Sequence, residues 1–238
     1  MIVCLDSGNT RIKWGVHDGV KWLAQGTVAH AEADRLSHLV AEWPLPEKVM
    51  LANVAGAEAD RRIRGQLAAW ASVFHEARPE LRRCGVTNHY KNPERLGVDR
   101  WCALLGARGL VDSAAVVVMA GTATTIDTLD ADGNFLGGVI LPGIGLMLRS
   151  LAHGTAALPF AEGEYASYPR CTDDAIVSGV IEAQTGAIER IFSRLADPIA
   201  CCFLSGGYAE QLVAHLVIRH RLTHNLPLEG LRHLALGT

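Results

Sequence analysis

The sequence lacks the charge that would direct it to nucleic acid. Its formal net charge is only −3, and its dense basic spots are the short runs Arg61–Arg64 and Arg82–Arg83. Binding along a phosphate backbone needs clustered Lys and Arg side chains. We therefore expect no nucleic-acid partner and interpret both runs as solvated surface.

Long apolar runs are also missing. Only four apolar residues, Ile2 to Leu5, precede Asp6, which is too few for the core of a signal peptide. Gly or Pro interrupts the longest uncharged stretches, near 113–126 and 133–148, before they reach the ~18 apolar residues of a membrane span. These absences predict a cytoplasmic protein without a membrane segment.

Common sequence signatures of metal and nucleotide sites are absent too. The six cysteines form no Cys-x-x-Cys pair, so we expect reduced thiols and assign no transition metal. No Gly-x-x-x-x-Gly-Lys-Ser/Thr or Gly-x-Gly-x-x-Gly segment occurs, which argues against a P-loop or a dinucleotide-binding loop. Any nucleotide site must have another architecture.

What the chain does contain is enough apolar material for a real core. Apolar residues make up 49% and charged residues 20% of its 238 residues, which is typical of a globular protein. The length admits one large domain or two of about 110 residues.

The first half reads as three strands followed by alternating helices and strands. Strand patterns cover 2–5, 12–17 and 20–28, with a hairpin turn at Asp18-Gly19. Helical patterns at 33–43 and 57–71 flank a strand at 49–54.

The second half repeats the opening of the first. A strand at 114–119 leads into a Gly-Thr loop, then come strands at 126–129 and 135–141 with a turn at Asp132-Gly133. Gly121 follows Gly8 by 113 positions, and Gly133 follows Gly19 by 114. This repetition predicts duplicated domains spanning 1–112 and 113–238. The second would finish with a helix at 173–195 capped by Thr172, a strand at 199–204 and a helix at 209–217.

The first group of residues with chemical potential is Asp6-Ser7-Gly8-Asn9-Thr10-Arg11-Ile12-Lys13. A hairpin turn built on Gly can present backbone N–H groups to phosphate oxygens. Asp6 would offer a carboxylate to hydrated Mg²⁺, and Lys13 a positive charge to the phosphates. The alternative is an ordinary turn, since these residue types favour turns on local grounds. The similar loop Gly121-Thr122-Ala123-Thr124-Thr125 favours a two-sided nucleotide clamp across an interdomain cleft.

The second group is Gly97-Val98-Asp99-Arg100, at the start of an apolar helical stretch. Asp99 could simply stabilise the helix N-terminus, where a negative charge is favoured. Alternatively, Asp99 could accept a proton from a substrate hydroxyl while Arg100 binds an anionic group.

Four ordered motifs then give a resemblance. They are Asp-x-Gly-Asn-Thr-x-x-Lys at 6–13, Gly-x-Asp-Arg at 97–100, Gly-Thr-Ala-x-Thr-x-Asp at 121–127, and Gly-Gly-x-Ile-x-Pro-Gly at 137–143. Together they resemble the type III pantothenate kinases, some of which are called Bvg accessory factors.

This resemblance implies an α/β fold of duplicated ribonuclease H-like domains with mixed five-stranded sheets, as in actin, hexokinase and Hsp70, assembled as a homodimer. It implies ATP as the phosphate donor, used with Mg²⁺, and pantothenate as the acceptor, in the first step of coenzyme A biosynthesis. The ATP phosphates would lie on residues 6–13 and on Thr122. Asp99 would be the base, and the substrate site would comprise the following residues: Tyr90, Gly97, Val98, Asp99, Arg100 and Thr172.

One position departs from the family pattern. The family commonly has Asp-x-Gly-Thr in the second loop, where the Asp is associated with a monovalent cation, but this chain has Met119. A thioether cannot replace a carboxylate as ligand of a hard cation such as K⁺ or NH₄⁺. Asp127 could compensate in part. A different small-molecule kinase of the superfamily, such as a sugar or acetate kinase, and a regulatory homologue without turnover are the alternative functions.

Overall fold

The computed structural model describes residues 1–237, which form two compact units. The first comprises 1–112, 133–135 and the segment from Asn225 onward, and the second comprises 113–132 and 136–224. The second unit therefore starts at the predicted boundary, whereas the last helix of the chain belongs to the first.

The first unit contains a five-stranded sheet in the order β3-β2-β1-β4-β5. Strands β1, β2 and β3 pair antiparallel, and β4 pairs parallel with β1 and with β5. Their bounds are Ile2–Ser7, Arg11–His17, Trp22–Ala29, Lys48–Asn53 and Phe74–Glu76 for β1 to β5. The predicted strands were thus placed within about two residues, because each alternates or is wholly apolar and ends at a turn signal.

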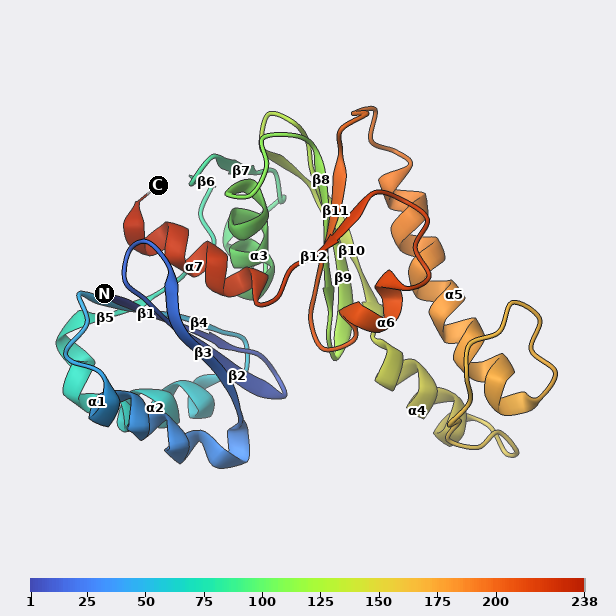
Figure 1. Ribbon diagram of the computed structural model, residues 1–238, viewed down its shortest axis with the longest axis horizontal. Coiled ribbons are helices and arrows are strands. Elements are labelled where there is room, and N and C mark those ends of the chain that lie inside the picture. The colour runs from blue at the N-terminus through green and yellow to red at the C-terminus, as the bar shows by residue number, and fades with distance from the viewer. Residues whose placement is uncertain (238) are drawn as a thin grey trace. The chain divides into compact units, whose positions relative to one another are not determined.

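Helices cover both faces of this sheet (Figure 1). One face buries Val3, Leu5 and Leu51 beneath α1 (Ser37–Glu42) and α2 (Ala57–Gln66). The predicted helices 33–43 and 57–71 are each divided, since the 3₁₀ segments η1 (His30–Leu36) and η2 (Ala68–Val73) take part of their length. The opposite face, with Cys4 and Asp6, receives α3 (Val98–Arg108) and α7 (Leu226–Leu236).

Helix α7 was not predicted, and it explains why the C-terminal segment joins the first unit. It crosses α3 so closely that a Cβ atom built on Gly230 would lie 1.8 Å from the Cys102 carbonyl oxygen. Trp22 Nε1 donates to Glu229 Oε1 over 2.6 Å, and Lys48 Nζ donates to the Ala235 carbonyl over 2.7 Å. These contacts tie α7 to β3 and β4.

The remaining elements of the first unit are short. They are β6 (Arg82–Arg83), β7 (Val86–Asn88) and the 3₁₀ turn η3 (Pro93–Arg95). Strand β7 pairs in parallel with Asn134 and Phe135.

The second unit repeats the strand order of the first. Its strands are β8 (Ala115–Ala120), β9 (Ala123–Leu129), β10 (Asn134–Pro142), β11 (Cys201–Ser205) and β12 (His220–Leu222). They lie in the order β10-β9-β8-β11-β12, and β11 pairs parallel with β8 and with β12. Numbered along each unit, these five strands repeat the order 3-2-1-4-5, which confirms the predicted duplication. The predicted five-stranded sheet was wrong here, because β7 pairs with the start of β10 and β6 with β7, which makes this sheet seven-stranded.

Three helices complete the second unit: α4 (Ile144–Gly154), α5 (Thr172–Phe192) and α6 (Ala209–Val213). The core joins Val118 and Ile126 of the sheet to Val180 and Ile188 of α5. The predicted cap of α5 was wrong by one residue, since Cys171 is the N-cap and Thr172 is the first helical residue. Helix α4 was missed because Gly143 and Gly145 at its start weaken the helical pattern.

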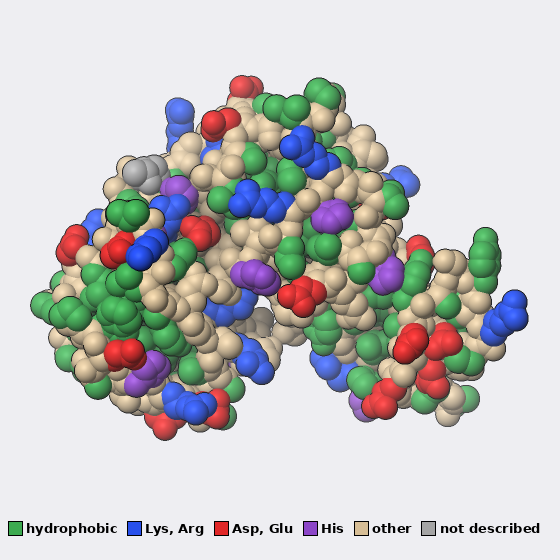
Figure 2. Space-filling view, viewed as in Figure 1, with side chains coloured by type: hydrophobic (Ala, Val, Ile, Leu, Met, Phe, Trp, Pro, Cys, Tyr) green, Lys and Arg blue, Asp and Glu red, His purple; other side chains and the backbone are tan. Residues whose placement is uncertain are grey.

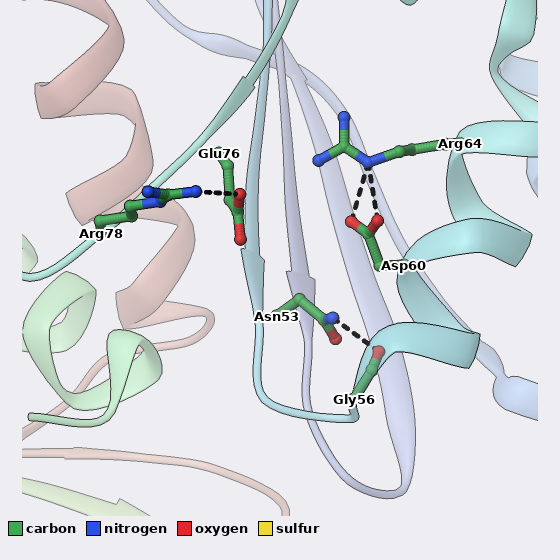
Figure 3. A network of polar contacts seen from close by, with 6 residues as sticks. All are labelled: Asn53, Gly56, Asp60, Arg64, Glu76 and Arg78. Carbon is green, nitrogen blue, oxygen red and sulfur yellow. Dashed lines mark hydrogen bonds and ion pairs between the residues drawn. The ribbon is translucent and has the colours of Figure 1, made fainter. Parts of the chain in front are cut away.

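The surface carries interspersed acidic and basic side chains on the face drawn in Figure 2. The basic run on α2 is largely paired with acids of its own helix, as Arg64 Nε lies 2.8 Å from Asp60 Oδ2 and Arg62 Nη2 lies 3.3 Å from Glu58 Oε1. Figure 3 shows the first pair beside the Glu76–Arg78 pair. Within residues 1–237, no helix is long and apolar enough to cross a membrane.

Candidate active site

The loop at residues 6–13 connects β1 to β2 in a tight hairpin. Asp6 and Lys13 are register partners on these strands, so their side chains lie on the same face of the sheet. The turn closes through a 3.1 Å hydrogen bond from the Gly8 N–H to the Arg11 carbonyl. Asn9 and Thr10 at its tip are exposed, as phosphate ligands must be.

Asp6 is a buried carboxylate with an oxygen that accepts no hydrogen bond from the described residues. Its side chain is 7% exposed, and its Oδ1 has no hydrogen-bond partner among the described residues. Burial raises the pKa of Asp6 from 3.8 to about 6, with a further rise from Asp99 and an opposing effect of Lys13. The neighbouring Ser7 hydroxyl is likewise buried without a partner in the described part of the chain. A cation beside Asp6 would relieve its desolvation.

Asp99 is placed by the N-terminus of α3. Gly97 is the N-cap, and Asp99 is the second helical residue, where its Oδ1 accepts a 2.8 Å hydrogen bond from the Arg100 N–H. A Cβ built on Gly97 would lie 2.7 Å from this Oδ1, so glycine leaves room for the carboxylate. The Asp99 charge contributes to the raised pKa of Asp6, and both residues belong to the first unit.

An aromatic cluster surrounds Arg100. This arginine is only 5% exposed, and its guanidinium lies 5.8 Å from the Tyr90 ring centre and 5.9 Å from that of Phe135. The two rings stack with their centres 6.0 Å apart. The predicted residues Tyr90, Gly97, Val98, Asp99 and Arg100 therefore belong to the first unit, with the two rings against Arg100. Phe135 was missed, because in the sequence it is only one apolar residue of a strand.

The second loop has the same backbone plan and different chemistry. Gly121 N–H donates to the Ala123 carbonyl over 3.1 Å, and the Thr122 carbonyl accepts from Gly143 N–H over 3.0 Å. The exposed Thr122 occupies the turn, whereas Met119 lies on β8 opposite Thr125. A Cβ on Gly143 would lie 2.2 Å from the Gly121 carbonyl oxygen, so this glycine lets the Pro-Gly segment approach the loop.

Asp127, the suggested substitute ligand, is fully buried. It pairs with Val117 on β8, two residues before Met119, and a Cβ on Gly138 would lie 2.0 Å from its Oδ1. Met119 itself offers only a thioether, which is a poor ligand for a hard cation.

Thr172 lines a groove of the second unit, with a volume of about 570 Å³, between α4 and α5. Most of its lining is apolar, including Met147, Leu151 and Ile176, and Ser150 adds a hydroxyl.

Cysteine and histidine chemistry does not point to a metal centre. All six cysteines are free. His220 and His224 are four residues apart, but His220 lies on β12 rather than on a helix, and no group of three potential His, Cys, Asp or Glu ligands occurs within residues 1–237.

Two repeats of five strands in the order 3-2-1-4-5, each with a glycine hairpin between its first two strands, define the phosphotransferase and ATPase fold shared by actin, hexokinase and Hsp70. The type III pantothenate kinase family model matches residues 2–194. The chain belongs to this family.

Individual proteins agree with that assignment. The chain is 87% identical over 236 residues to the type III pantothenate kinase of Dechloromonas aromatica (strain RCB), covering 99% of each chain. It superposes on a Baf family protein from Campylobacter jejuni with a TM-score of 0.65 at 22% identity, covering 98% of this chain and 96% of that one. It also superposes on a dehydratase activator from Clostridium difficile, solved with bound ADPNP, with a TM-score of 0.55 at 13% identity, covering 99% of this chain and 92% of that one. These two structures support the fold alone.

Proposed function

We propose that this protein transfers the γ-phosphate of ATP to the primary hydroxyl of pantothenate, giving 4'-phosphopantothenate and ADP in the first step of coenzyme A biosynthesis. Family membership at 87% identity supports the reaction. The observation that carries the assignment in this chain is the buried Asp6 carboxylate, whose Oδ1 has no partner among the described residues, on the strand that leads into the glycine hairpin.

The hairpin would hold the ATP phosphates. Backbone N–H groups at its tip and the Asn9 and Thr10 side chains supply donors, and Lys13 supplies positive charge. Thr122 would contribute from the second unit. Asp6, with its unpartnered oxygen, suits Mg²⁺ bound through water, and when bound this ion neutralises charge on the phosphates.

Asp99 would act as the base. Its carboxylate takes the proton of the pantothenate hydroxyl, while the hydroxyl oxygen bonds to the γ-phosphorus and the bond from that phosphorus to the β,γ-bridging oxygen breaks. Arg100, buried against two aromatic rings, would bind an anionic group of the acceptor, with Tyr90 and the backbone of Gly97 and Val98 shaping the site. Hydroxyl and phosphate held in line need little further activation.

We also propose that two copies of the chain associate through the second unit. Strand β10 pairs with β7 only at Asn134 and Phe135, and beyond them Leu136, Val139 and Ile140 are exposed. The groove carrying Thr172 adds apolar surface. A second copy would cover these groups, as exposed apolar area of this kind marks an interface. Light scattering after size exclusion should give twice the monomer mass of 25.5 kDa.

An ADP-release assay with pantothenate, a panel of sugars and acetate tests the activity. We expect ADP release with pantothenate alone, with and without added K⁺ or NH₄⁺. Turnover with a sugar or with acetate, and none with pantothenate, would show that pantothenate is not the acceptor. No turnover of folded protein with any acceptor would favour a regulatory protein.

A further inference from the structure

His30 contacts the tip of the hairpin that would hold the phosphates. It is the first residue of η1, directly after β3, whose final residue Ala29 is the register partner of Arg11. Its Nε2 lies 2.7 Å from the Gly8 carbonyl oxygen. Since a carbonyl only accepts, the imidazole must carry its proton on Nε2 and donate it.

This hydrogen bond determines which way a backbone donor points. The Gly8 carbonyl and the Asn9 N–H belong to one planar trans peptide unit, so they point in opposite directions. With its oxygen held by His30, the unit directs the Asn9 N–H away from the imidazole. The exposed Asn9 makes no hydrogen bond within the described residues, so its N–H is available to a phosphate oxygen.

The preceding peptide unit is held in the same manner. The Ser7 carbonyl accepts a 3.0 Å hydrogen bond from the Val54 N–H, and the Gly8 N–H of that unit donates to the Arg11 carbonyl. The carbonyls of two consecutive peptide units are therefore held by groups outside the loop. Val54 holds the Ser7 carbonyl with its backbone N–H, whereas His30 holds the Gly8 carbonyl with its side chain.

The His30 backbone is itself anchored. Arg62 on α2 donates from Nη1 to the His30 carbonyl over 2.9 Å and is restrained by its ion pair with Glu58. The imidazole is thus attached to a supported segment, as a group that orients a binding loop should be.

We infer that His30 is a positioning residue for nucleotide binding, which orients the Asn9 N–H toward a phosphate oxygen of ATP. The inference rests on the proposed placement of the phosphates on this hairpin. It predicts a specific effect on the nucleotide rather than on the acceptor, because Arg100 and Tyr90 are held by other contacts.

The test compares His30→Leu, His30→Gln and the control His75→Leu. Gln can place an amide N–H near the position of Nε2, whereas Leu cannot donate. His75 lies exposed on β5 and serves as a matched histidine. Steady-state kinetics give KM for ATP and for pantothenate, calorimetry gives Kd for MgADP, and thermal melting reports folding.

We expect His30→Leu to raise KM for ATP and Kd for MgADP about fivefold, the factor for one ordinary hydrogen bond, with KM for pantothenate and Tm unchanged. His30→Gln should recover most of the affinity, and His75→Leu should match wild type. Unchanged nucleotide affinity in His30→Leu, or equal losses for both substrates, would overturn the inference. If His30→Leu does not fold, His30→Asn, whose amide is too short to reach Gly8, takes its place with the same expectations.

A failure of the proposed function can be distinguished from a failure of the His30 inference. Wild type that binds MgADP but releases no ADP with pantothenate contradicts the assigned reaction, while the His30 comparison still proceeds by calorimetry. Wild type that binds no nucleotide overturns both.

Discussion

The two units have the same order of five strands but differ in the residues at equivalent positions. Asp6 stands two residues before the first-loop glycine Gly8, and Met119 stands two residues before Gly121. Asp99, the second helical residue of α3, also lies in the first unit. Both carboxylates of the site therefore belong to the first unit.

The difference shows that duplication repeats the fold without repeating its chemistry. Each hairpin presents backbone groups, which any residue supplies, and so this feature survives changes of sequence. A buried carboxylate, by contrast, costs stability unless it is paired or bound to a cation. The second unit has the neutral Met119 at the place of Asp6 and avoids that cost.

Replacing Asp99 with Asn should have the largest effect. Asn keeps the shape of Asp but cannot take the hydroxyl proton, so we expect kcat to fall about a thousandfold. Circular dichroism and Tm should stay close to wild type, since an N-terminal helix charge contributes only about 0.5 kcal/mol. The control is Asp112→Asn, whose fully exposed side chain lies 3.9 Å from Arg108. A normal rate in Asp99→Asn would remove Asp99 from the role of base.

Replacing Asp6 with Asn should reduce activity and stabilise the free protein. We expect kcat/KM for ATP to fall at least about tenfold, because the carboxylate for the cation is lost. The pKa of Asp6 is 3.8 when unfolded and about 6 when folded. The folded state thus favours the protonated form, and stability is lost as the pH rises from about 4 through 6.

Well above pH 6 the buried charge of Asp6 should cost about 3 kcal/mol, which the neutral Asn removes. Without nucleotide, Asp6→Asn should therefore have a higher Tm than wild type at pH 8 and a similar Tm at pH 4. The matching change Met119→Leu should leave Tm nearly the same at both values. A lower Tm for Asp6→Asn at pH 8 would contradict the burial argument.

Restoring a carboxylate to the second loop should have the smallest effect. The wild-type rate should change less than about twofold when K⁺ replaces Na⁺, because a thioether is a poor ligand for a hard cation. The Met119→Asp variant should respond more strongly to K⁺, whereas Met119→Asn should behave like wild type. Strong K⁺ activation of wild type would instead point to another ligand, with Asp127→Asn as the next variant to measure.

Much of the fold could be predicted because local patterns and the global fold agree. Short apolar strands ended by Gly turns gave the sheets, and the shift between Gly8 and Gly121 gave the duplication. Helix α4 was missed since its early glycines mimic a loop. Helix α7 was missed because its Pro-containing start and short length leave little periodic signal.

The chemistry of the candidate site could be proposed only where it follows a motif. Asp6, Lys13 and Asp99 lie in such motifs, and placement of their side chains follows from strand register and a helix start. Phe135 and His30 lie in none. Their roles depend on which segments pack together, such as β7 beside Asn134 and Phe135, and a single sequence carries no local sign of such pairing.

The return of α7 to the first unit has a consequence for protein synthesis. Glu229 is 207 residues from its partner Trp22, and Lys48 bonds to a carbonyl 187 residues later in the chain. As the ribosome releases the chain from its N-terminus, the face of β1 that carries Cys4 and Asp6 waits for its final helix until the last dozen residues emerge. The nascent first unit therefore stays incomplete until α7 is made, and its maturation depends on closing a loop across the 207 positions that separate Trp22 from Glu229.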